Sequence, residues 1–311
     1  MCGWMLGCAE LLTPLTELMK REVLLSTVIQ SDDTTVPTLG LVKGRAKDAQ
    51  FFCYLGDSAH RYAVFEYAIS RQGKWPQAWL KDFKGYLQTD AYAGYTALHG
   101  PGGAREVGCW AHARRGFFDA KDLAPGFCLD VLREIAKLYA VESDATKRGL
   151  SPGDRKASRE ESSRPQLEVI FALLESHHGK HLPKSPVYGA IEYVLKRREA
   201  FTRYLDDGLI DIDNNGCDRC MRNPALGRKN WLFAGSAAGG RAAAAWLSVI
   251  QSARLHEVEP FAYVSDLLTR LTKYRDMTPE RRATDGERLL RELLPDAWVK
   301  SNPEKRLALA R

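Results

Sequence analysis

One stretch of the chain constrains its fold more than any other. Asp211–Arg222 is an acidic, Asn-rich turn that leads into a short helix carrying a single carboxylate, Asp218. An acid beside bases at the start of a helix suits a site that holds a cation and a phosphate together. A purely structural alternative is that Asn215 caps this helix and Asp218 is the acidic member of a capping box.

Basic residues surround this acid in the sequence. Arg219 and Arg222 share its helix, and the pair Arg228-Lys229 follows closely behind. Because Arg228 and Lys229 come so soon after the acid-bearing helix, they are the stronger candidates for holding a phosphate backbone.

Composition sets broad limits on the class of protein. The 311 residues can bury a large core, and the net charge of +6 with a pI near 8.9 permits a polyanionic partner. No apolar run is long enough to cross a bilayer, and the N-terminus lacks the pattern of a signal peptide. Seven cysteines, an odd number, indicate reduced thiols in a cytoplasmic protein.

Hydrophobic patterning predicts strands alternating with helices, which is the α/β class. Three early strands form an expected antiparallel meander, and two later strands follow a short helix and a turn. The predicted strands are Leu25–Ile29, Gln50–Gly56, Tyr62–Ser70, Gly85–Asp90 and Ala104–Trp110.

The same patterning divides the chain into successive regions. We expect an N-terminal helix in residues 1–24, with Pro14 as a break or kink, and a mixed-sheet core beginning at residue 25. The complete division is 1–24 helix, 25–120 first part of the core, 121–205 helical insertion, 206–256 last part of the core, and 257–311 helical tail.

Three acids stand where a metal site could form. Asp32 (or its neighbour Asp33) and Asp90 each follow a predicted strand, whereas Asp218 lies on the late helix. Carboxylate oxygens are the ligands that Mg²⁺ and Mn²⁺ prefer, and two such ions about 3.5–4 Å apart can catalyse phosphoryl transfer. Acids at strand ends are also common turn formers, so the spacing by itself is weak evidence.

Several ordered motifs give the chain a resemblance to a known family. It resembles the transposases of the insertion sequence 66 family almost from end to end. The motifs that carry the resemblance are Asp32-Asp-Thr-Thr-Val-Pro37, Leu87-Gln-Thr-Asp-Ala-Tyr-Ala-Gly-Tyr95, Val107-Gly-Cys-Trp-Ala-His-Ala-Arg-Arg115, Leu182-Pro-Lys-Ser185, Ile191-Glu-Tyr-Val194, Asp211-Ile-Asp-Asn-Asn215 and Leu226-Gly-Arg-Lys-Asn-Trp-Leu-Phe-Ala-Gly-Ser236.

The resemblance implies a ribonuclease-H-like core with a three-acid (DDE) site holding two Mg²⁺ or Mn²⁺ ions. By position, Asp32 matches the first acid, Asp90 the second, and Asp218 the third. Asp218 departs from the family, which has glutamate there, and Gln30 stands where the family usually has histidine. The family also has a long N-terminal DNA-binding region, and we expect this chain to hold the catalytic portion only.

The motif after the fifth predicted strand offers further candidates. His112 lies three residues after Cys109, a Cys-x-x-His arrangement that the resemblance places near the active site. Arg114 and Arg115 follow it and could contact phosphate, although a solvated helix face explains each of them equally well.

Two other patterns have simpler explanations. Cys217-Asp-Arg-Cys220 lacks the second cysteine pair that a structural zinc site needs. Tyr92, Tyr95 and Trp231 could stack on bases, but aromatic residues more often belong to the core.

The resemblance therefore implies a DNA transposase that cleaves the ends of an insertion sequence and joins them to target DNA. The alternative is a catalytically inactive, DNA-binding remnant, which the Asp218 departure favours. The expected partners are transposon-end and target DNA, further copies of the chain assembled on DNA, and accessory proteins of the same element. No membrane partner is expected, and the predicted location is the bacterial cytoplasm, in association with the nucleoid.

Overall fold

The computed structural model describes residues 2–307, which fold into two compact units. The first unit joins the N-terminal part of the chain, up to Lys81, to everything from Gly216 onwards, and the second unit is Asp82–Asn215. Five strands form a mixed sheet with helices on its faces, so the predicted α/β class is confirmed. No described helix is both long enough and apolar enough to cross a membrane.

Three antiparallel strands build the sheet of the first unit, in the order β3-β2-β1. Their bounds are β1 Val28–Val42, β2 Arg45–Leu55 and β3 Ala63–Ala68. Phe51, Cys53 and Phe65 alternate onto one face, where they form a core with the late helices. On the opposite face, Tyr54 stacks on Trp79 of α2 with ring centroids 3.8 Å apart.

β1 is much longer than predicted, because the strand continues through the acids rather than ending before them. Asp32 pairs with Cys53, and Thr34 pairs with Phe51. The polar residues after Ile29 were expected to follow the strand, but their β-branched members favour an extended conformation and the partner strand supplies aromatic neighbours. The expectation that Asp32 follows a strand end is therefore wrong, since Asp32 lies inside the strand.

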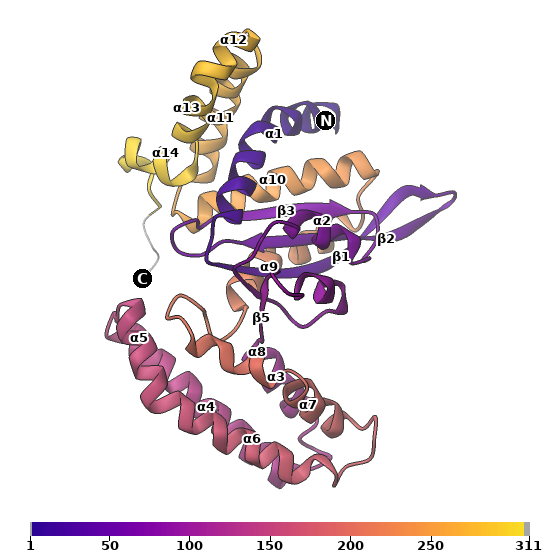
Figure 1. Cartoon of the computed structure of the whole chain (residues 1–311). Helices are drawn as coiled ribbons and strands as arrows, with labels where there is room; N and C mark the ends of the chain where they lie inside the picture. Colours follow the sequence, from indigo (N-terminus) through magenta and orange to yellow (C-terminus); the bar gives the residue numbers. More distant parts are fainter. Residues whose placement is uncertain (1, 308–311) are drawn as a thin grey trace. The chain divides into compact units, whose positions relative to one another are not determined.

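Helices complete the first unit. The N-terminal helix α1 packs against α10 and β3, and Pro14 lies within it without ending it; the arrangement is visible in Figure 1. The helices of this unit are α1 Cys2–Leu24, α2 Lys74–Leu80, α9 Asn215–Trp231, which starts at the last residue of the second unit, α10 Ala237–Leu255, α11 Pro260–Arg275, α12 Pro279–Arg281, α13 Glu287–Glu292 and α14 Pro295–Ser301, with η4 Arg282–Gly286 and η5 Pro303–Lys305.

The second unit has two short parallel strands followed by a helical array. The strands are β4 Tyr86–Gln88 and β5 Arg105–Val107. Arg159 is fully buried and forms an ion pair with Glu142 at 2.7 Å, which ties two segments of the array together. The remaining elements are η1 Ala93–Leu98, α3 Trp110–Asp119, α4 Pro125–Lys147, α5 Pro152–Ser158, η2 Arg159–Ser163, α6 Arg164–His178, α7 Pro186–Leu195, α8 Arg198–Thr202 and η3 Arg203–Leu205.

Candidate functional site

Asp32 and Asp33 are adjacent on β1, but their side chains lie on opposite faces of the sheet. Successive side chains of a strand point to opposite faces, and Asp32 is paired with Cys53, whose side chain belongs to the face covered by α9. Asp33 instead forms a bidentate ion pair with Arg71, at 2.9 Å between Nε and Oδ2. Since Asp33 is held by Arg71, Asp32 is the better metal-ligand candidate of the two.

The start of α9 is fixed directly to β1. The side-chain oxygen of Gln30 accepts a hydrogen bond from the backbone N–H of Cys217 at 3.0 Å. A Cβ atom added at Gly216 would lie 2.6 Å from that same oxygen, so the absence of a side chain at Gly216 allows the helix to approach the strand closely. Gln30 precedes Asp32 by two residues, and Cys217 precedes Asp218 by one. This contact therefore fixes the backbone segments that carry the two acids relative to one another.

Both acids act on the Cys217 thiol. The pKa of Cys217 is raised to about 11, mainly by burial, with smaller contributions from the negative charges of Asp32 and Asp218, while a hydrogen bond with Cys53 opposes the rise. Both carboxylates therefore contribute to the electrostatic environment of this thiol.

Asp218 is a half-buried carboxylate on the first turn of α9. Among residues 2–307, it has neither a hydrogen-bond partner nor an ion-pair partner. The capping-box alternative is not seen, because the Asn215 N–H donates to Asp213 at 3.1 Å. The Asp218 carboxylate is therefore available to another ligand.

Asp90 belongs to the second unit, two residues beyond the end of β4. Its Oδ1 accepts the N–H of Tyr92 at 2.9 Å, which closes a turn around Ala91, a residue with a positive φ of 66°. The Tyr193 hydroxyl donates to the Asp90 carbonyl at 3.2 Å. These contacts hold the Asp90 backbone in a defined turn directly after the strand, as the sequence predicted.

No group of three or more His, Cys, Asp or Glu side chains is gathered closely enough to hold a metal ion within the part of the chain that the structure describes. Asp32 and Asp218 lie in the first unit and Asp90 in the second. Within the first unit, Asp32 and Asp218 lie on β1 and α9, which are joined by the hydrogen bond between Gln30 and Cys217.

The Cys-x-x-His motif lies at the start of α3 in the second unit. His112 Nδ1 is 3.1 Å from the Cys109 sulfur, which also accepts the N–H of Asn214 at 3.4 Å. Burial raises the pKa of Cys109 to about 12, so this thiol stays protonated near neutral pH. Arg114 and Arg115 are exposed on the same helix.

Asn214 is a residue that the sequence interpretation did not single out. It is completely buried, yet neither atom of its side-chain amide has a hydrogen-bond partner in the described structure. Buried polar groups in native proteins nearly always form hydrogen bonds. The Asn214 amide can therefore still donate and accept hydrogen bonds. The sequence signal that could have identified it was the pair of adjacent asparagines, Asn214 and Asn215, in its motif.

The basic residues of α9 differ in their availability. Arg219, Arg222 and Lys229 are exposed, and within the described residues none of them forms an ion pair. Arg228 is half-buried and donates a hydrogen bond to the Thr35 carbonyl of β1. Arg228 therefore has a structural task in addition to any contact with phosphate.

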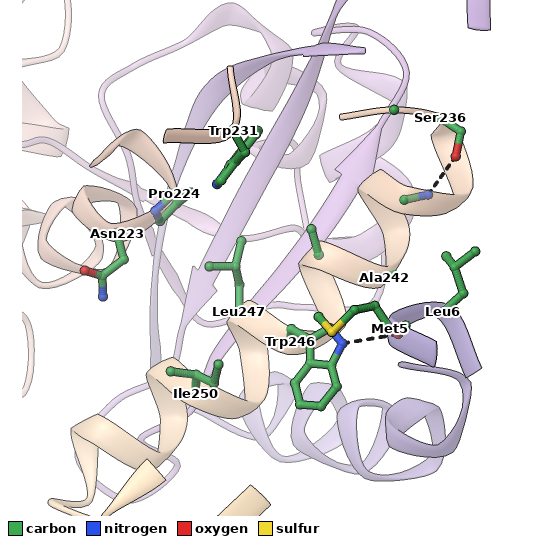
Figure 2. A pocket seen from close by; sticks show the side chains of 13 residues that line it. Met5, Leu6, Asn223, Pro224, Trp231, Ser236, Ala242, Trp246, Leu247 and Ile250 are labelled. Atoms are coloured by element: carbon green, nitrogen blue, oxygen red, sulfur yellow. Dashed lines mark hydrogen bonds between the residues drawn. The ribbon is translucent and has the colours of Figure 1, made fainter. Parts of the chain in front are cut away.

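The three aromatic candidates fall in different environments. Tyr95 is buried, and Tyr92 meets it edge to face at 5.9 Å between ring centroids. Trp231, which is 39% exposed, lies at the wall of an apolar cavity of about 620 Å³ formed by α1, α9 and α10 (Figure 2). Trp246 lines the same cavity and donates to the Met5 carbonyl at 3.3 Å.

Cys217 and Cys220 are buried in the core with Cys53, and all three are free thiols.

Comparison with known proteins identifies similar chains. The model of the family described as "Transposase IS66 family" matches residues 1–242. Uncharacterized protein y4hP of Sinorhizobium fredii (strain NBRC 101917 / NGR234) is 30% identical over 315 residues, covering 94% of this chain and 54% of its own length. Uncharacterized protein y4qI of the same strain is 33% identical over 257 residues, covering 78% of this chain and 47% of its own length.

The chain thus spans about half the length of the curated relatives it matches. No solved structure matches it.

Proposed function

Because the chain belongs to the IS66 family of transposases, we propose that it is the catalytic portion of a DNA transposase. In this proposal it cuts a DNA strand at the end of an insertion sequence. The freed 3′-hydroxyl then attacks a phosphodiester of the target DNA, so that one P–O bond forms as another breaks. Both steps are phosphoryl transfers and require the same kind of site.

The observation that supports the proposal is that Asp32 lies on β1 and Asp218 on the first turn of α9, two elements that are joined by the hydrogen bond between Gln30 and Cys217. The two acids are 186 positions apart (218 − 32), and that hydrogen bond fixes their elements together. A strand and a distant helix that each contribute an acid to one site would supply the carboxylate ligands that such a metal site needs. Asp90 of the second unit would supply the third acid.

The donor set fits a hard divalent cation. Each of the three proposed ligands is an aspartate, and Asp218 has no competing partner within residues 2–307. Mg²⁺ or Mn²⁺, as a pair of ions, would activate the attacking hydroxyl and stabilise the leaving oxygen. Asp32, Asp90 and Asp218 would hold these ions, while the exposed Lys229 and Arg222 would neutralise nearby phosphates.

The second candidate function is a remnant that binds DNA without cutting it. Asp218 favours it, because aspartate is one methylene shorter than the glutamate of the family motif. A shorter ligand must approach the metal more closely, and Mg²⁺ tolerates little deviation in geometry. On either candidate, DNA is the partner, and we propose assembly of several copies on it, with accessory proteins of the same element.

A strand-cleavage assay with DNA that carries the ends of the element tests the proposal. Asp32→Asn should abolish cleavage that depends on Mg²⁺ or Mn²⁺. Asp33→Asn is the matched control, since it changes the adjacent carboxylate on the other face of the sheet, where Arg71 is its partner. We expect the control to retain cleavage, and equal loss in both variants would contradict the proposed role of Asp32.

Activity of the wild-type chain decides between the two candidates. Metal-dependent cleavage that Asp32→Asn removes supports the enzyme. Salt-sensitive DNA binding without any metal-dependent cleavage supports the remnant.

A further inference from the structure

The first two strands continue well beyond the rest of the sheet of the first unit. β3 pairs with β2 only over Gln50–Leu55, whereas β1 and β2 remain paired out to Val42 and Arg45. The segment Thr38–Lys47, hereafter the arm, is therefore a two-stranded ribbon. Figure 1 shows it projecting past the end of β3.

The local geometry of the arm depends on two glycines. Gly40 and Gly44 both have φ near +76°, a conformation that glycine adopts without strain. Gly44 closes the turn at the tip, and Gly40 lies in a bulge between Thr38 and Val42, where the register of the two strands shifts. Bulges increase the twist of a ribbon, so this one turns the arm away from the plane of the sheet.

The base of the arm is anchored to the chain that follows α9. The Leu39 N–H donates to the Ala234 carbonyl at 2.9 Å, and the Ala234 N–H donates to the Pro37 carbonyl at 2.8 Å. Nearby, Arg228 donates to the Thr35 carbonyl. A fixed base allows the tip to hold a ligand in a defined direction.

The tip is exposed and basic. Lys43, Arg45 and Lys47 are all exposed, and Asp48 is the single acid beside them. Within the described residues, none of the three cations forms an ion pair. Three unpaired cations on a projecting ribbon create a positive potential that attracts polyanions.

We propose that the arm enters a groove of duplex DNA and that its three cations contact the flanking phosphates. The major groove, about 12 Å wide, accepts a two-stranded ribbon whose strands lie about 4.8 Å apart. The cations provide charge complementarity to the DNA backbone.

The length of the arm determines how far its DNA contact lies from Asp32. This inference rests on the proposed function of Asp32. Asp32 pairs with Cys53 and Val42 pairs with Arg45, so β2 covers in eight residues (53 − 45) the stretch that β1, with its bulge, covers in ten. Eight residues span roughly 26 Å at about 3.3 Å per residue. The arm thus contacts the duplex roughly 26 Å from the reacting phosphate, which is less than one helical turn of DNA, about 34–36 Å.

A simpler explanation is that the charges only protect an exposed strand edge. Lysine residues on edge strands discourage pairing with other chains. On this explanation their removal promotes aggregation and leaves DNA affinity unchanged, which a binding experiment can distinguish.

The test measures DNA binding by fluorescence anisotropy without divalent metal, from about 50 to 200 mM salt. The variant is Lys43→Ala with Arg45→Ala and Lys47→Ala. The matched control is Arg254→Ala with Lys273→Ala and Arg281→Ala, which removes the same charge from exposed positions of α10, α11 and α12 that form no ion pair within residues 2–307. Each lost phosphate contact lowers the slope of log K against log salt by about 0.9 for duplex DNA.

We expect the arm variant to lower the slope on a duplex by two to three, so that wild-type affinity falls about 40-fold more across this salt range. Its slope on single-stranded DNA of the same length should change by less than one, since no groove is present. The control variant should leave both slopes unchanged.

An unchanged duplex slope in the arm variant, an equal change in the control, or equal changes on duplex and single strand would each overturn the proposal. Because no metal is present, the result does not depend on catalysis. Failure of the proposed enzyme would appear instead as a loss of the difference between Asp32→Asn and Asp33→Asn in the cleavage assay.

Discussion

The side-chain oxygen of Gln30 and the backbone N–H of Cys217 are joined by a 3.0 Å hydrogen bond, which ties β1 to the first turn of α9. Gln30 is buried, and its bond satisfies one of the N–H groups that a helix leaves without a partner at its start. Gln30 therefore serves as a helix cap supplied by a distant strand.

Replacing Gln30 tests this role. Gln30→Ala should lower the free energy of unfolding by about 1–3 kcal/mol, because it leaves a buried donor unsatisfied. It should also reduce metal-dependent cleavage, since the start of α9 would no longer be fixed near Asp32. Urea denaturation and the cleavage assay measure the two effects. Thr34→Ala on the same strand serves as the control, and equal effects of both variants would contradict a specific role for Gln30.

The sequence predicted the α/β class and the helix that carries Asp218, because these depend on local patterning and motif order. It did not predict the length of β1, since the polar segment after Ile29 is extended only through pairing with β2. It also gave no sign of the bond between Gln30 and Cys217, whose partners are 187 residues apart. Contacts of that separation depend on the packed fold and leave no periodic signal.

Gly216 provides a second test of the contact between α9 and β1. In Gly216→Ala, the added methyl group would lie 2.6 Å from the Gln30 oxygen and 3.0 Å from Leu55 Cδ2. We expect a loss of about 1–3 kcal/mol in the free energy of unfolding, because overpacking forces the elements apart. Thermal or urea denaturation measures it.

The control for this substitution is Gly7→Ala in α1, where an added Cβ atom would meet nothing within 4 Å. There the better helix propensity of alanine should stabilise the protein by up to about 1 kcal/mol. Stabilisation in both variants would show that the close approach at Gly216 does not constrain the helix.

The two basic residues near the end of α9 should behave differently. Lys229→Ala should lower the salt slope of DNA binding by about 0.9 without affecting stability, because this side chain is exposed. Arg228→Ala should in addition lower the free energy of unfolding by about 1 kcal/mol, because the bond to Thr35 is lost. Anisotropy titrations and urea denaturation separate the effects. If DNA binding by the wild type did not weaken as the salt concentration rises, the proposed phosphate contacts of Arg228 and Lys229 would be contradicted.

Glu66 should make stability depend on pH. Burial raises the pKa of this β3 carboxyl from its ordinary value of 4.5 to about 7, although the hydrogen bond from the Tyr54 hydroxyl opposes the rise. A pKa raised in the folded state adds stability below pH 4.5, and this stability is lost as the pH rises through 7.

Glu66→Gln preserves the shape of the side chain and its acceptor for Tyr54 but removes the titration. Relative to wild type, this variant should gain roughly 2–3 kcal/mol in the free energy of unfolding between pH 4.5 and pH 8. Urea denaturation at several pH values measures the difference. A constant difference between the two proteins across this range would show that the pKa of Glu66 is not raised.

Asp218 separates the enzyme from the remnant. Glutamate reaches about one C–C bond further than aspartate, and Mg²⁺ sites require close control of ligand geometry. If the first unit has adjusted to the shorter side chain, Asp218→Glu should lower metal-dependent cleavage and Asp218→Ala should abolish it. If it has not adjusted, Asp218→Glu should raise cleavage above the wild-type level.

The assay for Asp218 uses DNA that carries the ends of the element, with Mn²⁺ and Mg²⁺ tested separately, because Mn²⁺ accepts a wider range of ligand geometry. Arg222→Ala, an exposed residue one turn further along α9, is the control for general damage to this helix and should weaken DNA binding without abolishing cleavage. Identical background cleavage in the wild type, Asp218→Glu and Asp218→Ala would contradict a catalytic role for Asp218 and leave DNA binding as the function of this chain.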